Sequence, residues 1–344
     1  MPNDDDVDRI RPQGAAPRRG SGESGGSGSG RADDGGDRGR RADEPNEIPA
    51  SGWKDIALRV KDEMKTDHVT LSASGVAFHL FLALAPGLAA AVSIYGLVAD
   101  PANVTSLADR LGSSVPEALS TLIEDQLGAV VSSDSGALGV GAAIGILLAV
   151  WSASSGMTNM IEAINIAYDE DPDDRPFWKK RGIALGFTVL FIVFVALIGT
   201  LLGLAAAMSG ALAIVLGVGA AVLSGVLFAV LLSVFYRYGP DRDDPEWSWA
   251  SVGAVIAVVL WLIASAAFSF YVANFGSYNE TYGALGAIVV VLLWLFISAL
   301  VVMVGAEINA EMEHQTTSDT TKGPEQPIGD RDATVADTVG DTAS

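Results

Sequence analysis

The sequence contains no cysteine and only three histidines among its 344 residues. The absence of cysteine excludes disulfides and thiolate metal sites. His68, His79 and His314 show no paired spacing, and the long apolar runs contain no acidic metal cluster. A hydrolase needs such a metal site or a general acid–base pair. We therefore predict no catalytic site, no metal and no cofactor, and a membrane-bound hydrolase is the weakest function class considered.

Lysine is also scarce, and the 41 acidic residues outnumber the 21 basic ones to give a formal net charge of −20. Nucleic-acid binding requires a basic footprint, so this balance argues against a nucleic-acid partner. Two explanations of the acidity stay open, namely adaptation to high salt and an acidic tail at each end. The first thirty residues hold no apolar segment, so we expect no cleavable signal peptide.

Half of the residues are apolar, and they fall in long blocks, which is typical of membrane proteins. The run from Leu285 to Ala306 exceeds the ~20 apolar residues needed to cross a bilayer. The sequence predicts an all-α, polytopic membrane protein with six transmembrane helices. They are expected at about 71–98, 137–158, 183–208, 211–235, 250–272 and 285–309.

The remaining segments are polar. Residues 1–49 are of low complexity and residues 314–344 are acidic, so both are predicted to be disordered tails around a membrane domain at 50–313. Residues 53–67 predict an amphipathic helix, which lies either at the membrane interface or against another cytoplasmic loop. Residues 100–136 predict two short amphipathic helices.

Basic residues predict the orientation. Arg and Lys gather before the first run, between runs two and three, and between runs four and five, whereas the opposite loops hold only Arg110. Cytoplasmic loops carry the excess of Lys and Arg. An even number of spans puts both ends on one side, so we predict that both termini are cytoplasmic and that the protein lies in the plasma membrane.

Four stretches carry a family resemblance. They read SASGVAFHLFLALAPGL, WSASSGMTNMIEAINIAY, YRYGPDRDDPEWSWASVGA and SYNETYGALGAIVVVLLWLFISALVVMVGAEINAE. In this order they resemble the YihY/BrkB family of inner-membrane proteins, once mislabelled as ribonuclease BN. The resemblance covers about Trp53 to Glu313 and implies a six-span helical bundle in the cytoplasmic membrane, with no particular reaction. Phe78 and His79 stand where the family commonly has a Tyr-rich start.

Glu307, with Asn309 nearby, is the most distinctive candidate for a functional residue. It ends the last apolar run, and ionisable groups near the membrane usually face the bundle interior or water. One interpretation is a site for an ion, a proton or a lipid headgroup. The other is a carboxylate at the helix end that pairs with an Arg or Lys.

A second set of candidates lies on the second run at helical spacing. If these residues form a path, the path opens toward the cytoplasm. If they instead join helices by hydrogen bonds, each bond contributes about 0.6 kcal/mol. The set comprises Ser152, Ser155, Asn159, Glu162 and Asn165.

Three further residues complete the candidates. His79 and Pro86 lie on one stripe of the first run, where Pro86 predicts a helix kink and His79 is either a core histidine or part of a path. Tyr282 lies in the turn before the last run, where an aromatic belt at the headgroup level is the leading interpretation.

These patterns predict a transporter, or a protein that handles a small solute or lipid, with membrane lipids as its partners. The polar stripes on runs one, two and six would form its path. The alternative is a membrane scaffold or envelope-integrity protein, in which the same stripes only pack helices together.

Overall fold

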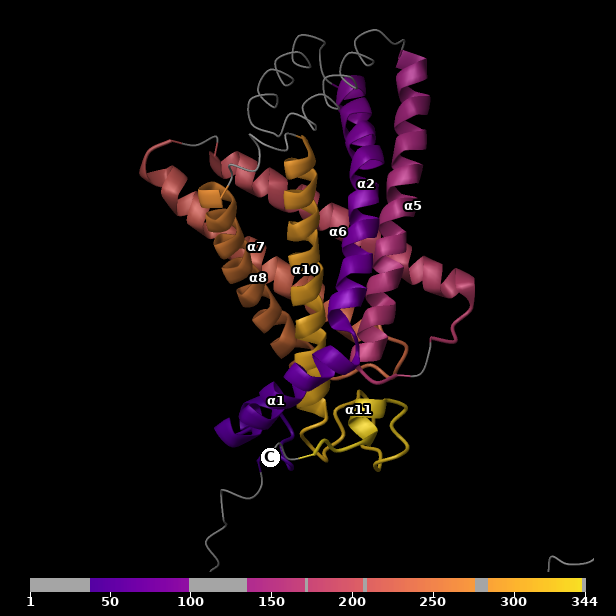
Figure 1. Cartoon of the computed structure of the whole chain (residues 1–344), viewed down its shortest axis with the longest axis vertical. Coiled ribbons are helices and arrows are strands. Elements are labelled where there is room, and N and C mark those ends of the chain that lie inside the picture. Colours follow the sequence, from indigo (N-terminus) through magenta and orange to yellow (C-terminus); the bar gives the residue numbers. More distant parts are fainter. Residues whose placement is uncertain (1–37, 99–134, 171–172, 207–208, 276–283, 342–344) are drawn as a thin grey trace, which may run out of the picture. The chain divides into compact units, whose positions relative to one another are not determined.

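The computed structural model describes residues 38–98, 135–170, 173–206, 209–275 and 284–341 (Figure 1). Within these ranges the protein is helical and contains no strand; one isolated bridge joins Pro245 to Thr321. The predicted helices at 100–136 and the candidate Tyr282 lie outside the described residues.

Two N-terminal helices meet at a sharp bend. Helix α1 (Ala50–Thr66) is followed by α2 (Val69–Val98), and the two are bent by 64°. At this bend His68 has a φ of +51°, in the left-handed region that few residues other than Gly adopt. The buried face of α1, with Ile56 and Val60, packs beside the end of the last long helix. Packing against the protein is therefore the observed role of this face.

The long helices form a bundle in which α2 lies alongside α5 (Ser135–Ala167), as Figure 1 shows. The chain continues through α6 (Phe177–Ala206), α7 (Ala211–Tyr238), α8 (Trp247–Phe275) and α10 (Ala284–Glu313). Helix α10 packs against α2, α5 and α8, which makes it the central helix of the described bundle.

The helices confirm the helical class and agree closely with the predicted runs. Among the described residues, five helices are long and apolar enough to cross a membrane, or six if the bent α1–α2 pair forms one span. Most of the helices extend a few residues beyond the predicted runs, because helical hydrogen bonding continues past the apolar core into polar flanks. Pro86 lies inside α2, and the helix continues on both sides of it.

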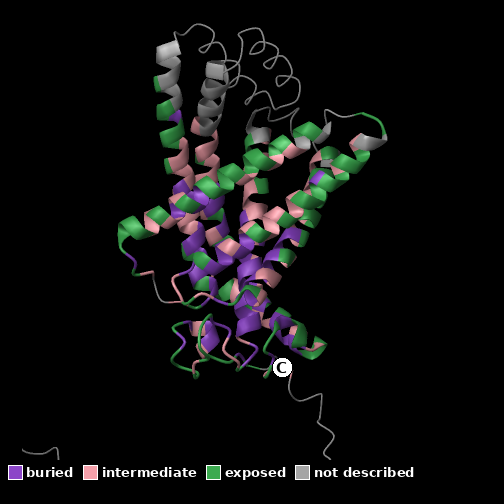
Figure 2. Cartoon of the chain, turned by 180° about the vertical axis from the view of Figure 1, so that it is seen from behind, coloured by how far each residue is buried: buried purple, intermediate pink, exposed green. Residues whose placement is uncertain are grey.

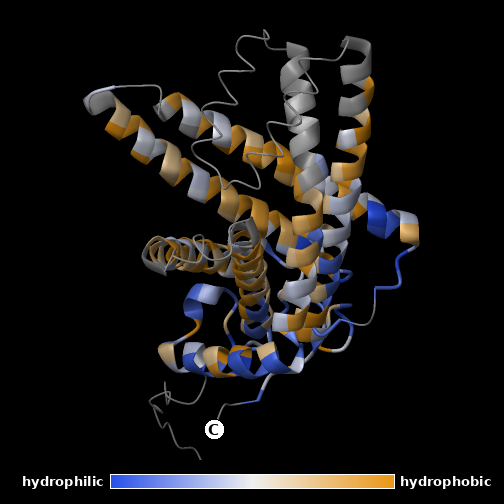
Figure 3. Ribbon diagram, turned by 45° about the horizontal axis from the view of Figure 1, so that its top comes forward, coloured by the Kyte–Doolittle hydropathy of each residue, from blue (hydrophilic) through white to orange (hydrophobic). Residues whose placement is uncertain are grey.

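Burial is concentrated at one end of the bundle, where α1 lies (Figure 2). The described part of the other end exposes large apolar side chains, and Leu147, Ile214 and Phe270 are 69–71% exposed. Figure 3 shows that these exposed helices are hydrophobic, whereas polar residues gather near α1. Exposed apolar surface on such helices is suited to contact with lipid.

The predicted disorder at both ends is wrong for the described residues. Residues 38–49 contain the 3-10 helix η1 (Pro45–Glu47), and Ala42 and Ile48 are buried. Residues 314–341 contain the short helix α11 (Thr334–Asp337) and pack beneath α10, as Figure 1 shows.

The C-terminal segment, residues 314–341, is held by hydrogen bonds in addition to a few buried apolar side chains such as Val335. The Arg331 guanidinium donates to the carbonyls of Thr317 (2.9 Å), Ser318 (3.1 Å), Gln326 (3.1 Å) and Ala336 (2.6 Å). The prediction of disorder was based on the low apolar content of this segment. Amino-acid composition cannot show that one arginine will bind four backbone carbonyls.

Candidate functional site

Glu307 lies near the end of α10 and is only 1% exposed. Its Oε1 atom has no hydrogen-bond partner among the described residues. The carboxyl group that acts on it most strongly belongs to Asp67, in the turn between α1 and α2, so the two carboxyl groups lie close together. In the part of the chain that the structure describes, no Arg or Lys forms the ion pair with Glu307 that was the predicted alternative.

A hydrogen bond between two carboxyl groups would require a proton on one of them, because an ionised carboxylate only accepts. Burial raises the pKa of Asp67 to about 6, and the charges of Asp169 and Glu63 act in the same direction. We refer to Asp67 and Glu307 as the acid pair. The acid pair can hold one proton at a junction of three helices, α1, α2 and α10.

The surroundings of the acid pair are also acidic. Glu63, Asp169 and Glu311 act on it electrostatically. Only Glu311 has strong basic partners, since Arg59 Nε donates to its carboxylate and Arg59 Nη2 donates to its carbonyl (3.0 Å). His314 Nδ1 lies 3.7 Å from the same carboxylate. Arg59 therefore pairs with Glu311, and no Arg or Lys of the described residues pairs with Asp67 or Glu307.

Asn309 is fully buried and joins α10 to α8. Its Oδ1 accepts from the Gly253 backbone N–H (2.7 Å), and its Nδ2 donates to the Ala250 carbonyl (3.1 Å). The amide thus binds one donor and one acceptor of the neighbouring backbone. This geometry is that of a residue that joins two packed helices.

Gly253 and Gly305 allow α8 and α10 to touch through their backbones. A Cβ atom on Gly253 would lie 2.1 Å from the Gly305 carbonyl oxygen, and one on Gly305 would lie 2.4 Å from the Tyr236 hydroxyl. Small residues permit such close helix approaches in membranes. Sequence reasoning did not single out this pair, because both glycines lie in ordinary-looking apolar runs.

The candidates on α5 point to different neighbours. Asn159 Nδ2 lies 3.0 Å from His79 Nδ1 on α2, and that nitrogen is also 2.9 Å from the Gly75 carbonyl. Ser155 accepts from Arg181 of α6 (3.3 Å). One ring nitrogen cannot donate to Gly75 and accept from Asn159 at the same time. If Nδ1 of His79 carries the proton it donates to the Gly75 carbonyl, and if it does not it accepts from the Asn159 amide.

The other three α5 candidates also lie apart, and Ser152 is half-buried. Asn165 is buried and its Oδ1 accepts from the Asp241 backbone N–H (2.8 Å) in the loop after α7. Glu162 is exposed. The α5 candidates therefore reach three different parts of the bundle and form no single described path.

A buried ion pair that sequence reasoning missed lies beside this end of α10. Arg242 Nη2 is 2.6 Å from Glu313 Oε2, and both side chains are fully buried. Thr320 donates to the same oxygen (2.8 Å), and the guanidinium lies 4.7 Å from the centre of the Tyr168 ring. The only sequence signal was a basic residue in a polar loop, which does not reveal a partner far along the chain.

The comparisons with known proteins fit this arrangement. Residues 60–329 match the family model described as "Virulence factor BrkB". The chain belongs to the BrkB family. No curated protein and no solved structure matches it.

The BrkB match extends beyond α10 into the C-terminal segment, as far as residue 329. It also includes the acid pair, Asn309 and the Arg242–Glu313 ion pair. Among the described residues, no group of three or more His, Asp or Glu side chains is placed to hold a metal ion.

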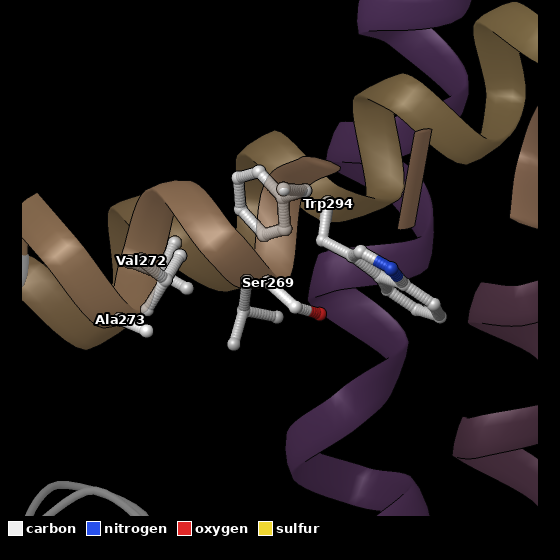
Figure 4. A pocket seen from close by; sticks show the side chains of 7 residues that line it. Ser269, Val272, Ala273 and Trp294 are labelled. Atoms are coloured by element: carbon white, nitrogen blue, oxygen red, sulfur yellow. The ribbon is translucent and has the colours of Figure 1, made fainter. Parts of the chain in front are cut away.

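One groove of this BrkB-family protein lies between α8 and α10 and is apolar. Figure 4 shows Ser269, Val272 and Ala273 of α8 lining it beside Trp294 of α10. It contains none of the predicted site residues, and its open apolar lining resembles the lipid-facing surface around it. The acid pair is thus the best-supported candidate site.

Proposed function

We propose that this BrkB-family membrane protein moves or handles a small solute or a lipid, with the acid pair as a proton-binding element. The observation that carries the proposal is Glu307, a nearly fully buried carboxyl group whose described partner is a second carboxyl group. Ionisable groups held within a membrane bundle are costly and mark proton, ion or substrate pathways.

The acid pair lies between helices, so a change in its charge would act on the positions of α1, α2 and α10. Loss of the shared proton would leave two like charges in a buried place, and their repulsion would favour separation of α1 and α2 from α10. The bend at His68 offers a place for that movement. The charged and titratable groups that face the pair from the packed elements are Arg59, Glu63, Tyr168, Asp169, Glu311 and His314.

We also propose that the α1 end of the bundle faces the cytoplasm and that the protein lies in the plasma membrane. The Arg and Lys excess at this end supports that orientation. The acid pair would then exchange protons with the cytoplasmic side.

A scaffold is the second candidate function, and the bonding of Asn309 favours it. Both ends of this amide bind the α8 backbone, as a residue that joins two helices would. A scaffold accounts for Asn309, but it gives no reason for a buried Glu307 beside another carboxyl group.

Flux in proteoliposomes tests the proposal. The purified full-length protein would be reconstituted, and proton-linked solute uptake and scrambling of a fluorescent phospholipid would be measured. We expect wild-type flux and its loss in Glu307→Gln. Glu162→Gln is the matched control, because it removes the same charge from an exposed position.

Two results would overturn the transport proposal. One is equal flux in wild type and in a folded Glu307→Gln variant. The other is no flux from a well-folded wild type across solutes, ions and lipids, which would favour the scaffold.

A further inference from the structure

Arg237 is a buried arginine without an acidic partner. It is the penultimate residue of α7 and is 2% exposed. Its Nε and Nη1 atoms bind no acceptor among the described residues, and no described ion pair includes it. A guanidinium group carries five donors and stays charged. Its hydrogen-bonding capacity is therefore unused.

The other buried arginines of the described bundle show how unusual this is. Arg242 pairs with Glu313, and Arg175 pairs with Asp173 at 2.7 Å. Arg331 binds four carbonyls. A buried charge without a partner is strongly destabilising. A ligand with a negatively charged hydrogen-bond acceptor would pair with the Arg237 guanidinium and remove this cost.

Two exposed aromatic rings flank the Arg237 guanidinium. Its carbon lies 4.7 Å from the centre of the Trp247 ring and 5.3 Å from that of Tyr238. The two rings pack edge to face with centres 6.1 Å apart. Trp247 is 50% exposed and Tyr238 is 42% exposed. The rings hold the guanidinium plane in place while their outer faces reach the surface.

These rings lie at the ends of two candidate membrane spans. Tyr238 ends α7, Trp247 begins α8, and the exposed Trp178 lies at the start of α6. Arg175 Nη2 donates to the Gly239 carbonyl (3.1 Å), which holds the start of α6 beside the end of α7. Trp and Tyr gather at membrane–water interfaces, where phospholipid phosphates also lie.

We infer that Arg237, held between Trp247 and Tyr238, binds a phosphate group at the membrane interface. The planar guanidinium matches two phosphate oxygens at once, and the paired charges neutralise each other in a partly buried place. The phosphate belongs either to a phospholipid headgroup or to a soluble phosphate ester. This site is independent of the acid pair, so either can fail alone.

Lipid binding to the delipidated full-length protein tests the site. Native mass spectrometry would count bound phosphatidylglycerol, a neutral galactolipid with the same acyl chains and no phosphate, and soluble glycerol phosphate. We expect the protein to prefer phosphatidylglycerol over the galactolipid. Arg237→Gln should weaken that binding about tenfold or more, since hydrogen bonds to charged groups contribute roughly 1.5–3 kcal/mol.

Arg181→Gln is the matched control. Arg181 also stacks on a tryptophan, with its guanidinium carbon 4.0 Å from the Trp151 ring centre, but it binds Ser155 and the Trp151 carbonyl. We expect this variant to bind phosphatidylglycerol as the wild type does. Arg237→Lys keeps the charge and loses the planar fork, so it should bind several-fold more weakly than wild type.

The outcomes separate the sources of phosphate. A preference for phosphatidylglycerol that only the Arg237 variants lose identifies a lipid headgroup, whereas equally tight, Arg237-dependent binding of glycerol phosphate identifies a soluble ester. No preference over the galactolipid would overturn the site, and so would unchanged binding in folded Arg237→Gln. If that variant does not fold, unchanged binding in Arg237→Lys would overturn it.

Discussion

At the scale of single residues, the buried polar groups differ in how much of their hydrogen-bonding capacity the protein uses. Asn309 uses both ends of its amide on α8, and Glu313 accepts from Arg242 and Thr320. Glu307 and Arg237 each keep buried polar atoms without a described partner. A satisfied group stabilises the bundle, whereas an unsatisfied buried group costs about 1–3 kcal/mol or more. The first two residues therefore act in packing, and the other two are the ones for which we propose a function.

The contact between Gly253 and Gly305 yields a prediction at this scale. Gly253→Ala would place a methyl group within 2.1 Å of the Gly305 carbonyl oxygen, so α8 and α10 must move apart. We expect the free energy of unfolding to fall by roughly 1–3 kcal/mol, as in other overpacked cores. Thermal unfolding of the purified protein would measure the change.

Gly186→Ala is the control for this prediction. Gly186 lies on the exposed face of α6 with nothing within 4 Å of an added Cβ. That substitution should be neutral or slightly stabilising, since Ala favours helix more than Gly does. Equal stability of the two variants would contradict the close helix contact.

At the scale of elements, the bend between α1 and α2 and the C-terminal segment enclose the same end of α10. The bend brings Asp67 to Glu307, and the C-terminal segment provides Thr320 for Glu313 and Gln315 for Arg59. Thr334 also donates its backbone N–H to Glu170, just after α5 (3.0 Å). These contacts tie the segment to the bundle, although its composition resembles that of a disordered tail.

Arg331→Met tests whether one side chain holds the C-terminal segment. The variant loses four hydrogen bonds to carbonyls, so we expect amide hydrogen exchange in residues 314–341 to quicken by about tenfold or more. Arg41→Met is the control, because Arg41 is exposed and has no described side-chain bond. Equally fast exchange in wild type and Arg331→Met would show that the segment is not held this way.

At the scale of the whole molecule, the described bundle is tightly packed at the α1 end and open at the other. The polar contacts and the two candidate sites lie at the packed end, whereas the exposed apolar residues extend from it (Figures 2 and 3). Lipid can solvate apolar side chains but not buried polar groups. The protein therefore places its polar groups where its own helices enclose them.

The absence of cysteine makes the topology directly testable. Six spans place both ends of the chain on one side, whereas five place them on opposite sides. We expect single cysteines at Glu44→Cys and Asp330→Cys, both exposed positions, to resist a membrane-impermeant maleimide until the cells are opened. Labelling of one site in intact cells would contradict the six-span, cytoplasmic-end topology.

The sequence by itself determined the helical membrane class and the approximate ends of the helices. Transfer of an apolar run into lipid depends on about twenty consecutive residues, so a local window carries that information. The sequence also indicated Glu307, because one acid at the end of an apolar run is conspicuous without any knowledge of its neighbours.

Only the tertiary structure decided what these residues contact. Asp67 meets Glu307 because of a 64° bend, and Gly253 meets Gly305 because two distant helices cross there. The same holds for Arg331, which binds four carbonyls of the C-terminal segment, and for Arg237, whose Nε and Nη1 bind no acceptor among the described residues. The contacts of a side chain depend on which distant groups the fold brings next to it. A local pattern of apolar and polar residues contains no information about those groups.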